Sequence, residues 1–165
     1  MRANIRTAVA ALLLAGSASA ALAQVSVTYV KPKEFMDVPH SELERDRLLK
    51  QFTDYFATLD KKLPAGQQLK IEVLDIDLAG RLWPRRSGGE DLRVLNGGAD
   101  WPHMHVHYTL EENGKVLRSG DDQLSNMMYQ QRTTRYWDSD ALRYEKQMID
   151  DWFDKTIIAP QVAAQ

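Results

Sequence analysis

Residues 101–124 read WPHMHVHYTLEENGKVLRSGDDQL and give the clearest indication of the fold. Its first part, residues 101–110, alternates polar and apolar side chains, which is the pattern of a strand with one buried face. Asn113 and Gly114 follow, and this dipeptide is the strongest short signal for a two-residue hairpin turn. Residues 116–124 are then expected to return beside the first strand. The sequence therefore predicts an antiparallel hairpin.

Two further strands and a helix are expected before this hairpin. Residues 25–30 alternate and are rich in β-branched and aromatic side chains, which indicates a strand. Ser41 and Glu44 have the spacing of a capping box, and apolar residues then recur at helical spacing for about 20 residues. Residues 69–78 read as a strand whose apolar side switches near Leu74, as either a central strand covered differently at its two ends or a β-bulge would cause.

The remaining elements complete an α+β pattern. Gly80 opens a long irregular stretch in which only residues 92–95 hint at a strand. A last amphipathic helix is expected to begin near Asp138 or Ser139 and to end at Pro160. The order β-α-β-β-β-α predicts a two-layer sandwich, with a mixed four- to five-stranded sheet and both helices on one face. Its first two strands should be parallel, because a helix connects them.

The first 23 residues have the pattern of a cleavable signal peptide. Arg2 and Arg6 are the only charges, an apolar run covers residues 8–15, and small residues follow. The small side chains of Ala21 and Ala23 favour a cut before Gln24, with a cut after Ala20 as the second choice. The apolar run is too short to span a bilayer. We therefore expect an exported periplasmic protein, with a single domain over residues 24–158 and a flexible tail over residues 159–165.

Composition excludes several classes of protein. The chain has 21 basic and 23 acidic side chains, and removal of the signal peptide with its two arginines leaves 19 against 23, a formal charge of −4. This mildly acidic balance argues against non-specific binding to nucleic acid. No cysteine is present, so neither a disulfide nor a lipid on an N-terminal cysteine can form. The fold must be stabilised by its core.

Three histidines alternate along the strand of residues 101–110. His103, His105 and His107 are expected on one face, about 7 Å apart. Asp75 and Asp77 have the same spacing on the preceding strand and would complete a zinc or copper site if the two strands were neighbours. The alternative is that histidine and aspartate simply occupy the solvated face of the sheet. The spacing is compatible with both interpretations.

Arginine and tryptophan gather in two presumed loops. These residues are common at binding hot spots, because they offer large contact areas and planar or bidentate donors. They could stack on sugar rings or anchor a partner protein, with the arginines holding anionic groups. Alternatively, each tryptophan fills a gap and each arginine pairs with a nearby acid. The candidate residues are Arg81, Trp83, Arg85, Arg86, Arg132, Arg135 and Trp137.

Catalytic signatures are missing from the sequence. It contains no glycine-rich phosphate or dinucleotide loop, no nucleophile elbow and no His-Glu-x-x-His motif. No residue is therefore assigned a catalytic role. A non-enzymatic binding protein for an envelope component or partner protein is the first interpretation. A metal-binding protein that uses the histidine strand is the second, and a metal-dependent hydrolase is the third.

Several stretches together resemble a known family. They are DIDLAG at residues 75–80, WPHMHVHYTL at 101–110, and RYEK at 143–146 with DWF at 151–153. These pieces resemble a family of bacterial periplasmic proteins catalogued as a domain of unknown function, over about residues 25–153. The resemblance implies a periplasmic protein without a lipid anchor. It implies no activity, cofactor or catalytic residue.

Overall fold

The computed structural model of the chain describes residues 22–83 and 92–162. Four strands form its main sheet in the order β1-β2-β5-β6, with β1 and β2 parallel and the other two pairs antiparallel. This is the mixed sheet of the predicted α+β class. The strands are β1 (Gln24–Tyr29), β2 (Gln67–Asp77), β5 (His103–Glu112) and β6 (Lys115–Ser125).

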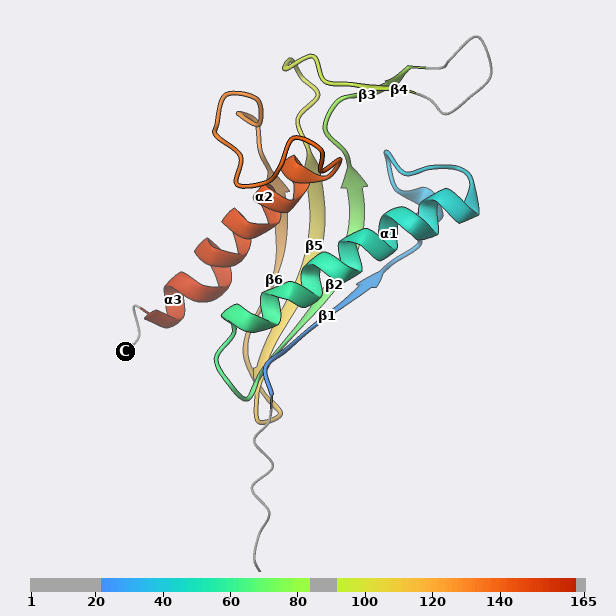
Figure 1. The fold of residues 1–165 in the computed structure, drawn as a ribbon. Helices are drawn as coiled ribbons and strands as arrows, with labels where there is room; N and C mark the ends of the chain where they lie inside the picture. Colours follow the sequence, from blue (N-terminus) through green and yellow to red (C-terminus); the bar gives the residue numbers. More distant parts are fainter. Residues whose placement is uncertain (1–21, 84–91, 163–165) are drawn as a thin grey trace, which may run out of the picture.

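Two helices cover one face of this sheet (Figure 1). They are α1 (Glu42–Ala57) and α2 (Arg143–Trp152). The core between the layers is fully buried, because one face of each central strand and one stripe of each helix are apolar. Its most enclosed side chains include Phe52, Phe56, Leu69, Val73, Val106, Leu110, Ile149 and Phe153. The other face of the sheet carries polar side chains, as the alternation of residues 101–110 predicts.

The predicted bulge in the second strand is present. The register of β2 against β5 shifts between Val73 and Asp75. An extra residue in one strand reverses the side to which the following side chains point. Val73 and Ile76 can therefore both be buried although they are three residues apart, and Asp75 and Asp77 are directed to the open face.

The hairpin turn also agrees with its sequence. Asn113 and Gly114 connect β5 to β6 with φ values of 51° and 78°. A type I′ turn needs a positive φ at both central residues, which asparagine and glycine tolerate best.

The predicted strand at residues 92–95 exists, but it does not join the main sheet. The strand β4 (Leu92–Val94) pairs with β3 (Arg81–Trp83) in a separate antiparallel sheet of two strands. This small sheet lies beyond the end of β2, above the start of α1 (Figure 1). The connection turns sharply at Gly80, which has φ +85°.

Two helix starts differ from their predictions. Ser41 is the N-cap residue of α1 but makes no side-chain capping bond, so the predicted capping box does not form. The last helix begins at Arg143 rather than at Asp138 or Ser139, because the Asp140 carboxylate accepts the backbone N–H of Leu142 at 2.9 Å and holds a turn open. Shorter 3₁₀ segments are η1 (Pro32–Glu34) and η2 (Thr58–Lys62).

Pro160 does not end the last helical segment. A π-helical turn, η3 (Phe153–Ile158), follows α2, and the chain stays helical through α3 (Ala159–Val162). Proline has no N–H to donate to the carbonyl four residues earlier, here that of Thr156. The Arg118 guanidinium on β6 donates to this carbonyl instead. In the part of the chain that the structure describes, no helix is long and apolar enough to cross a membrane.

Candidate functional site

The three histidines lie on the open face of β5, where they are half-exposed. Because β2 pairs directly with β5, Asp75 is opposite His105 and Asp77 is opposite His103. The strands that carry the predicted metal ligands are therefore neighbours, which the sequence leaves open. Asp75, Asp77, His103 and His105 lie beyond the bulge, whereas His107 is opposite Glu72 before it.

These side chains differ in the partners they already have. Both ring nitrogens of His107 are engaged, with Asp121 at 3.0 Å and with Ser119 at 3.3 Å. One carboxylate oxygen of Asp75 accepts the backbone N–H groups of Met36 at 2.8 Å and of Ile76 at 2.9 Å. Asp75 therefore acts as a cap for the backbone at the bulge.

Asp77 and His103 have fewer hydrogen-bond partners than His107 and Asp75. His103 Nδ1 lies 3.7 Å from Asp77 Oδ2, too far for a hydrogen bond, and this nitrogen is buried without a partner. Burial raises the pKa of Asp77, and the nearby carboxylates of Asp37 and Asp75 add to the rise. A small cavity of about 80 Å³ lies beside these groups, and Gln123 also lines it. Over residues 22–83 and 92–162, no three His, Asp or Glu side chains are already gathered to hold a metal ion.

The predicted arginine and tryptophan residues divide into two groups. Arg132 and Arg135 hold the Asp151 carboxylate at 2.7 and 2.9 Å. Trp83 and Trp137 are exposed, with 59% and 86% of their surface accessible. The first pair fits the interpretation in which arginines pair with acids, whereas the tryptophans do not fill gaps in the core. Arg81 is exposed on β3, and the predictions for Arg85 and Arg86 lie outside the described residues.

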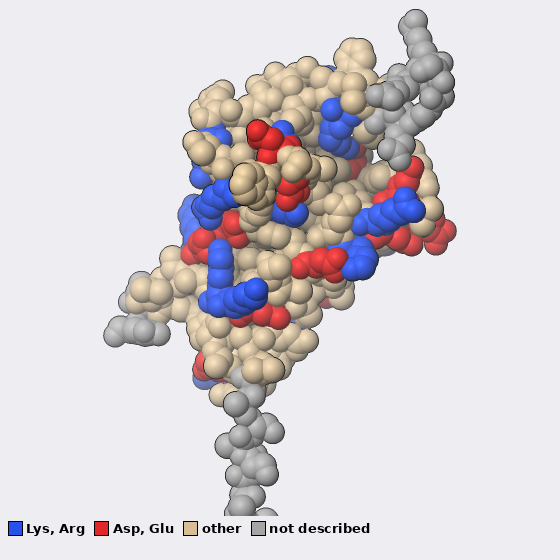
Figure 2. Space-filling view, in the orientation of Figure 1, with Lys and Arg blue, Asp and Glu red and all other residues tan. Residues whose placement is uncertain are grey.

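The arginines belong to a larger cluster of polar groups between α1 and α2. Burial alone would raise the pKa of Asp150, but hydrogen bonds from Tyr136 and Tyr55 and the Lys62 ammonium outweigh it and hold the pKa below its usual value. Tyr136 Oη donates to Asp150 at 2.7 Å. Basic and acidic side chains lie next to each other over this face (Figure 2). The cluster ties the two helices and the loop before α2 together.

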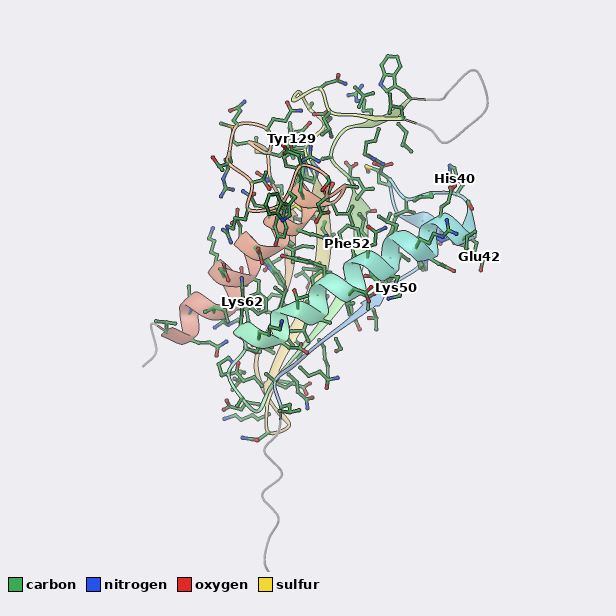
Figure 3. The ribbon with its side chains drawn as sticks, in the orientation of Figure 1. His40, Glu42, Lys50, Phe52, Lys62 and Tyr129 are labelled. Atoms are coloured by element: carbon green, nitrogen blue, oxygen red, sulfur yellow. The ribbon has the colours of Figure 1, made fainter. Side chains whose placement is uncertain are left out.

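A larger cleft lies at the start of α1. It has a volume of about 790 Å³, which is within the range of sites for small molecules and peptides. The loop after η1 and the first turns of α1 form its walls, and Leu82 on β3 also lines it. His40 and Glu42 mark this end of α1, far from Lys62 beyond its other end (Figure 3). The lining residues include Lys33, Phe35, Met36, Asp37, Val38, Pro39, His40, Ser41, Glu42, Glu44, Arg45, Arg47, Leu48, Gln51 and Leu82.

Arg45 is the most buried charged group of this cleft, with 5% of its surface accessible. Its guanidinium donates to the backbone carbonyls of His40 at 3.2 Å and Pro39 at 3.4 Å. These bonds fix the loop against the helix, because a buried guanidinium is costly unless its N–H groups have acceptors. The wall of the cleft is therefore preformed.

Exposed apolar side chains gather around the cleft. Met36 and Leu82 line it with 75% and 44% of their surface accessible, and Leu43 is exposed on the first turn of α1. Trp83 and Leu92 are paired across the small sheet and are also exposed, but they do not line the cleft. Apolar side chains concentrated at one end of a protein often mark an interaction surface.

Most of the chain matches one known family of proteins. A family model described as "Protein of unknown function (DUF3016)" matches residues 23–155. The chain belongs to the DUF3016 family. Searches of curated proteins and of solved structures found no match. The family description states no activity, so the function of this DUF3016 domain must be argued from its own residues.

Sequence reasoning missed the cleft of this DUF3016 domain. Its walls come from segments that are separate in sequence, namely the loop after η1, the first turns of α1, and β3. One local signal was available. Arg45 lies three and four residues before Leu48 and Leu49, so it occupies the apolar stripe of the helix. A charge within such a stripe indicates a buried polar contact at that position.

Proposed function

We propose that this DUF3016 domain is an exported, non-enzymatic binding protein, and that the cleft at the start of α1 binds a segment of a partner protein in the bacterial envelope. The exposed apolar side chains around the cleft are the observation that carries the proposal. Exposed side chains of this size cost little as isolated residues, but together they form a surface that a partner can bury.

The mixture of side chains favours a protein as the partner. A protein interface has apolar anchors at its centre and a polar rim, and it is enriched in tryptophan, methionine and arginine. Met36 and Leu82 supply apolar contacts inside the cleft. Lys33, Arg47 and other charged residues of the lining provide the polar groups. A partner segment with one or two large apolar side chains fits this arrangement.

Export to the periplasm is part of the proposal. It is supported by the charge, apolar run and small residues of the first 23 positions. The first strand begins at Gln24, so a cut before this residue leaves β1 whole. The absence of cysteine is compatible with an oxidising compartment, since no free thiol is present to form unwanted disulfides.

Photo-cross-linking in living cells tests this function. A photoreactive residue is placed at Met36 in the cleft and, as a control, at Thr28, which is exposed on β1. We expect a discrete adduct with one envelope protein from position 36 and none from position 28. A second substitution, Leu82→Glu, should remove the adduct, because it places a carboxylate on the cleft wall.

Binding of the purified partner then gives the quantitative result. Leu82→Glu should weaken its affinity by roughly tenfold or more, as the loss of an apolar anchor does. Circular dichroism should show that the variant is folded, since Leu82 is exposed. Equal adducts from positions 36 and 28, or unchanged affinity in Leu82→Glu, would contradict the proposed site.

A further inference from the structure

We propose that Asp77, His103 and His105 form a binding site for one divalent transition-metal ion, zinc or copper. The site lies on the open face of the sheet where β2 ends and β5 begins, and it adjoins the proposed partner-binding cleft without sharing a lining residue with it. Asp77 and His103 are directly paired across the two strands, and His105 is the next residue on the same face of β5. Carboxylate and imidazole are suitable ligands for both ions.

The spacing of Asp77 and His103 suits a shared ion. Two ligand atoms bonded to a tetrahedral ion at about 2.1 Å are separated by about 3.4 Å. The observed distance between His103 Nδ1 and Asp77 Oδ2 is 3.7 Å, which is too long for a hydrogen bond but close to this value. His103 Nδ1 is also buried without a partner. A bound ion would satisfy this nitrogen, and it would hold both side chains with only a small movement.

His105 supplies the third ligand after a side-chain rotation. Ligand atoms are not gathered in threes among the described residues, so the site has to close around its ion. His105 is half-exposed on the open face of β5, so its ring has space to turn. The cavity of about 80 Å³ between His103, His105 and Gln123 has room for the ion and a water molecule. Catalytic and binding sites commonly keep one such water position open.

The charges around the site favour a cation. The carboxylates of Asp75 and Asp37 lie near Asp77, as does the Arg93 guanidinium. Arg93 is itself bonded to Asp37 at 2.7 Å, so negative charge remains in excess near Asp77. A divalent ion would relieve this repulsion, which adds to the free energy of binding.

The proposed site is smaller than the pattern of five residues in the sequence. His107 is excluded because Asp121 and Ser119 already engage both of its ring nitrogens. Asp75 is not assigned as a primary ligand, because one of its oxygens holds two backbone N–H groups and fixes the carboxylate at the bulge. It acts from outside the coordination sphere, through its charge. Because His107 lies on the same strand and the same face but is not a ligand, it serves as a matched control.

Calorimetry with the metal alone tests the site. The protein is freed of metal with a chelator and titrated with zinc, and then in a separate experiment with copper(II), at pH 7.5. We expect one ion per chain with micromolar affinity or better. Loss of an outer-shell partner weakens metal binding by roughly 10- to 100-fold. His103→Asn and Asp77→Asn remove ligands, so each should weaken binding by more than this. His107→Asn should leave the affinity unchanged.

A spectroscopic measurement separates a specific site from adventitious binding. Zinc, which is diamagnetic, should shift the ring signals of His103 and His105 in nuclear magnetic resonance spectra at stoichiometric metal, and shift those of His107 much less. No heat above dilution would overturn the proposal, and so would equal losses of affinity in His103→Asn and His107→Asn. The cleft variant Leu82→Glu should bind metal as the unmodified protein does. Failure of the metal site would therefore leave the partner-binding proposal standing, and the reverse also holds.

Discussion

Glu145 lies almost wholly inside the protein, on α2, with 2% of its surface accessible. One carboxyl oxygen accepts the backbone N–H of Ala79 at 2.8 Å, and the other is buried without a partner. Burial raises the pKa of this carboxyl group, and the Ala79 hydrogen bond and the arginines Arg93 and Arg143 oppose the rise without cancelling it. The side chain links α2 to the end of β2, and it does so at an electrostatic cost near neutral pH.

This cost predicts the pH dependence of stability. The unfolded chain loses the Glu145 proton near pH 4.5, whereas the folded protein keeps it to higher pH. The contribution of Glu145 to stability is therefore complete below pH 4.5 and is lost as the pH rises through the raised folded pKa. Glu145→Gln keeps the acceptor for Ala79 and removes the charge. We expect this variant to be about 1 kcal/mol more stable than the unmodified protein at pH 7.5, with the advantage shrinking towards pH 4.

Urea unfolding at several pH values measures this difference. Glu44→Gln is the control, because Glu44 is exposed in the first turn of α1 and should give a pH profile close to that of the unmodified protein. If the profiles of Glu145→Gln and the unmodified protein ran parallel between pH 4 and pH 7.5, the raised pKa would be refuted.

Gly80 carries a second prediction at the residue scale. It has φ +85°, and an added Cβ would lie 2.5 Å from the Val94 carbonyl oxygen of the small sheet. Gly80→Ala must therefore strain the backbone and separate β2 from the small sheet. We expect it to lower the free energy of unfolding by roughly 1 to 3 kcal/mol. Gly98→Ala is the matched control, since nothing lies within 4 Å of its added Cβ, and it should change stability by less than about 0.5 kcal/mol. Equal effects of the two substitutions in urea unfolding would show that the close approach is unimportant.

At the scale of elements, the sequence predicts what local periodicity controls. The alternation of β5, the bulge after Val73 and the turn at Asn113 and Gly114 are all found where the pattern places them. Each depends on side chains within a few residues of one another, since backbone conformation and the buried face are set locally. The two helices are also recognised from their apolar stripes.

Helix ends are predicted less well because several residues compete for the same role. Asp138, Ser139 and Asp140 can each cap a helix, and only tertiary contacts select among them. Asp140 accepts from Lys146 at 2.7 Å as well as from the backbone of Leu142, which fixes the turn just before α2. Selection by a later contact is invisible in the local pattern.

The same distinction applies to the candidate sites. Alternation alone places three histidines on one face, and the pairing of β2 with β5 then decides which acids lie opposite them. The partners that occupy His107 and Asp75 come from another strand and from a loop. The cleft depends on segments that are separate in sequence, so neither its volume nor its walls follow from any one of them. The local sequence therefore shows only which residues are of a type that can bind a metal ion or a partner.

Arg118 on β6 and Pro160 on α3 can be tested together, because both affect the hydrogen bonding of the Thr156 carbonyl. Pro160 leaves the Thr156 carbonyl without its helical donor, and Arg118 on β6 supplies a substitute. We expect Arg118→Met to lower the free energy of unfolding by about 1 to 2 kcal/mol, because the carbonyl loses its charged donor. In a Pro160→Ala background, the backbone N–H gained at position 160 is able to bond to the Thr156 carbonyl. In this background, Arg118→Met should lower the free energy of unfolding by less than it does in the unmodified protein, and the difference should be about 0.5 kcal/mol or more. A double-mutant cycle in urea measures this coupling, and strict additivity would exclude it.

The part of the chain that the structure describes has one core, and no helix in it covers the other face of the main sheet (Figure 1). Both helices cover the same side of the sheet (Figure 1), and the sequence contains no cysteine, so packing on that side must supply nearly all of the stability. Neighbouring residues on β5 separate the two faces. Leu110 is buried in the core with 1% of its surface accessible, whereas Thr109 lies on the open face, where its hydroxyl bonds to that of Ser119.

Substitution of these two neighbours tests the two-layer arrangement. Leu110→Ala leaves a cavity between the sheet and the helices, and we expect it to cost roughly 2 to 5 kcal/mol. Thr109→Ala, one residue away on the same strand, should cost less than about 0.5 kcal/mol because its face is solvated. Both values come from urea unfolding at pH 7.5, and reducing agent should change neither. If Thr109→Ala were as costly as Leu110→Ala, a further layer would have to cover the open face, for example a second copy of the chain. The cost of Thr109→Ala would then depend on protein concentration, because a face buried by association gains stability with concentration.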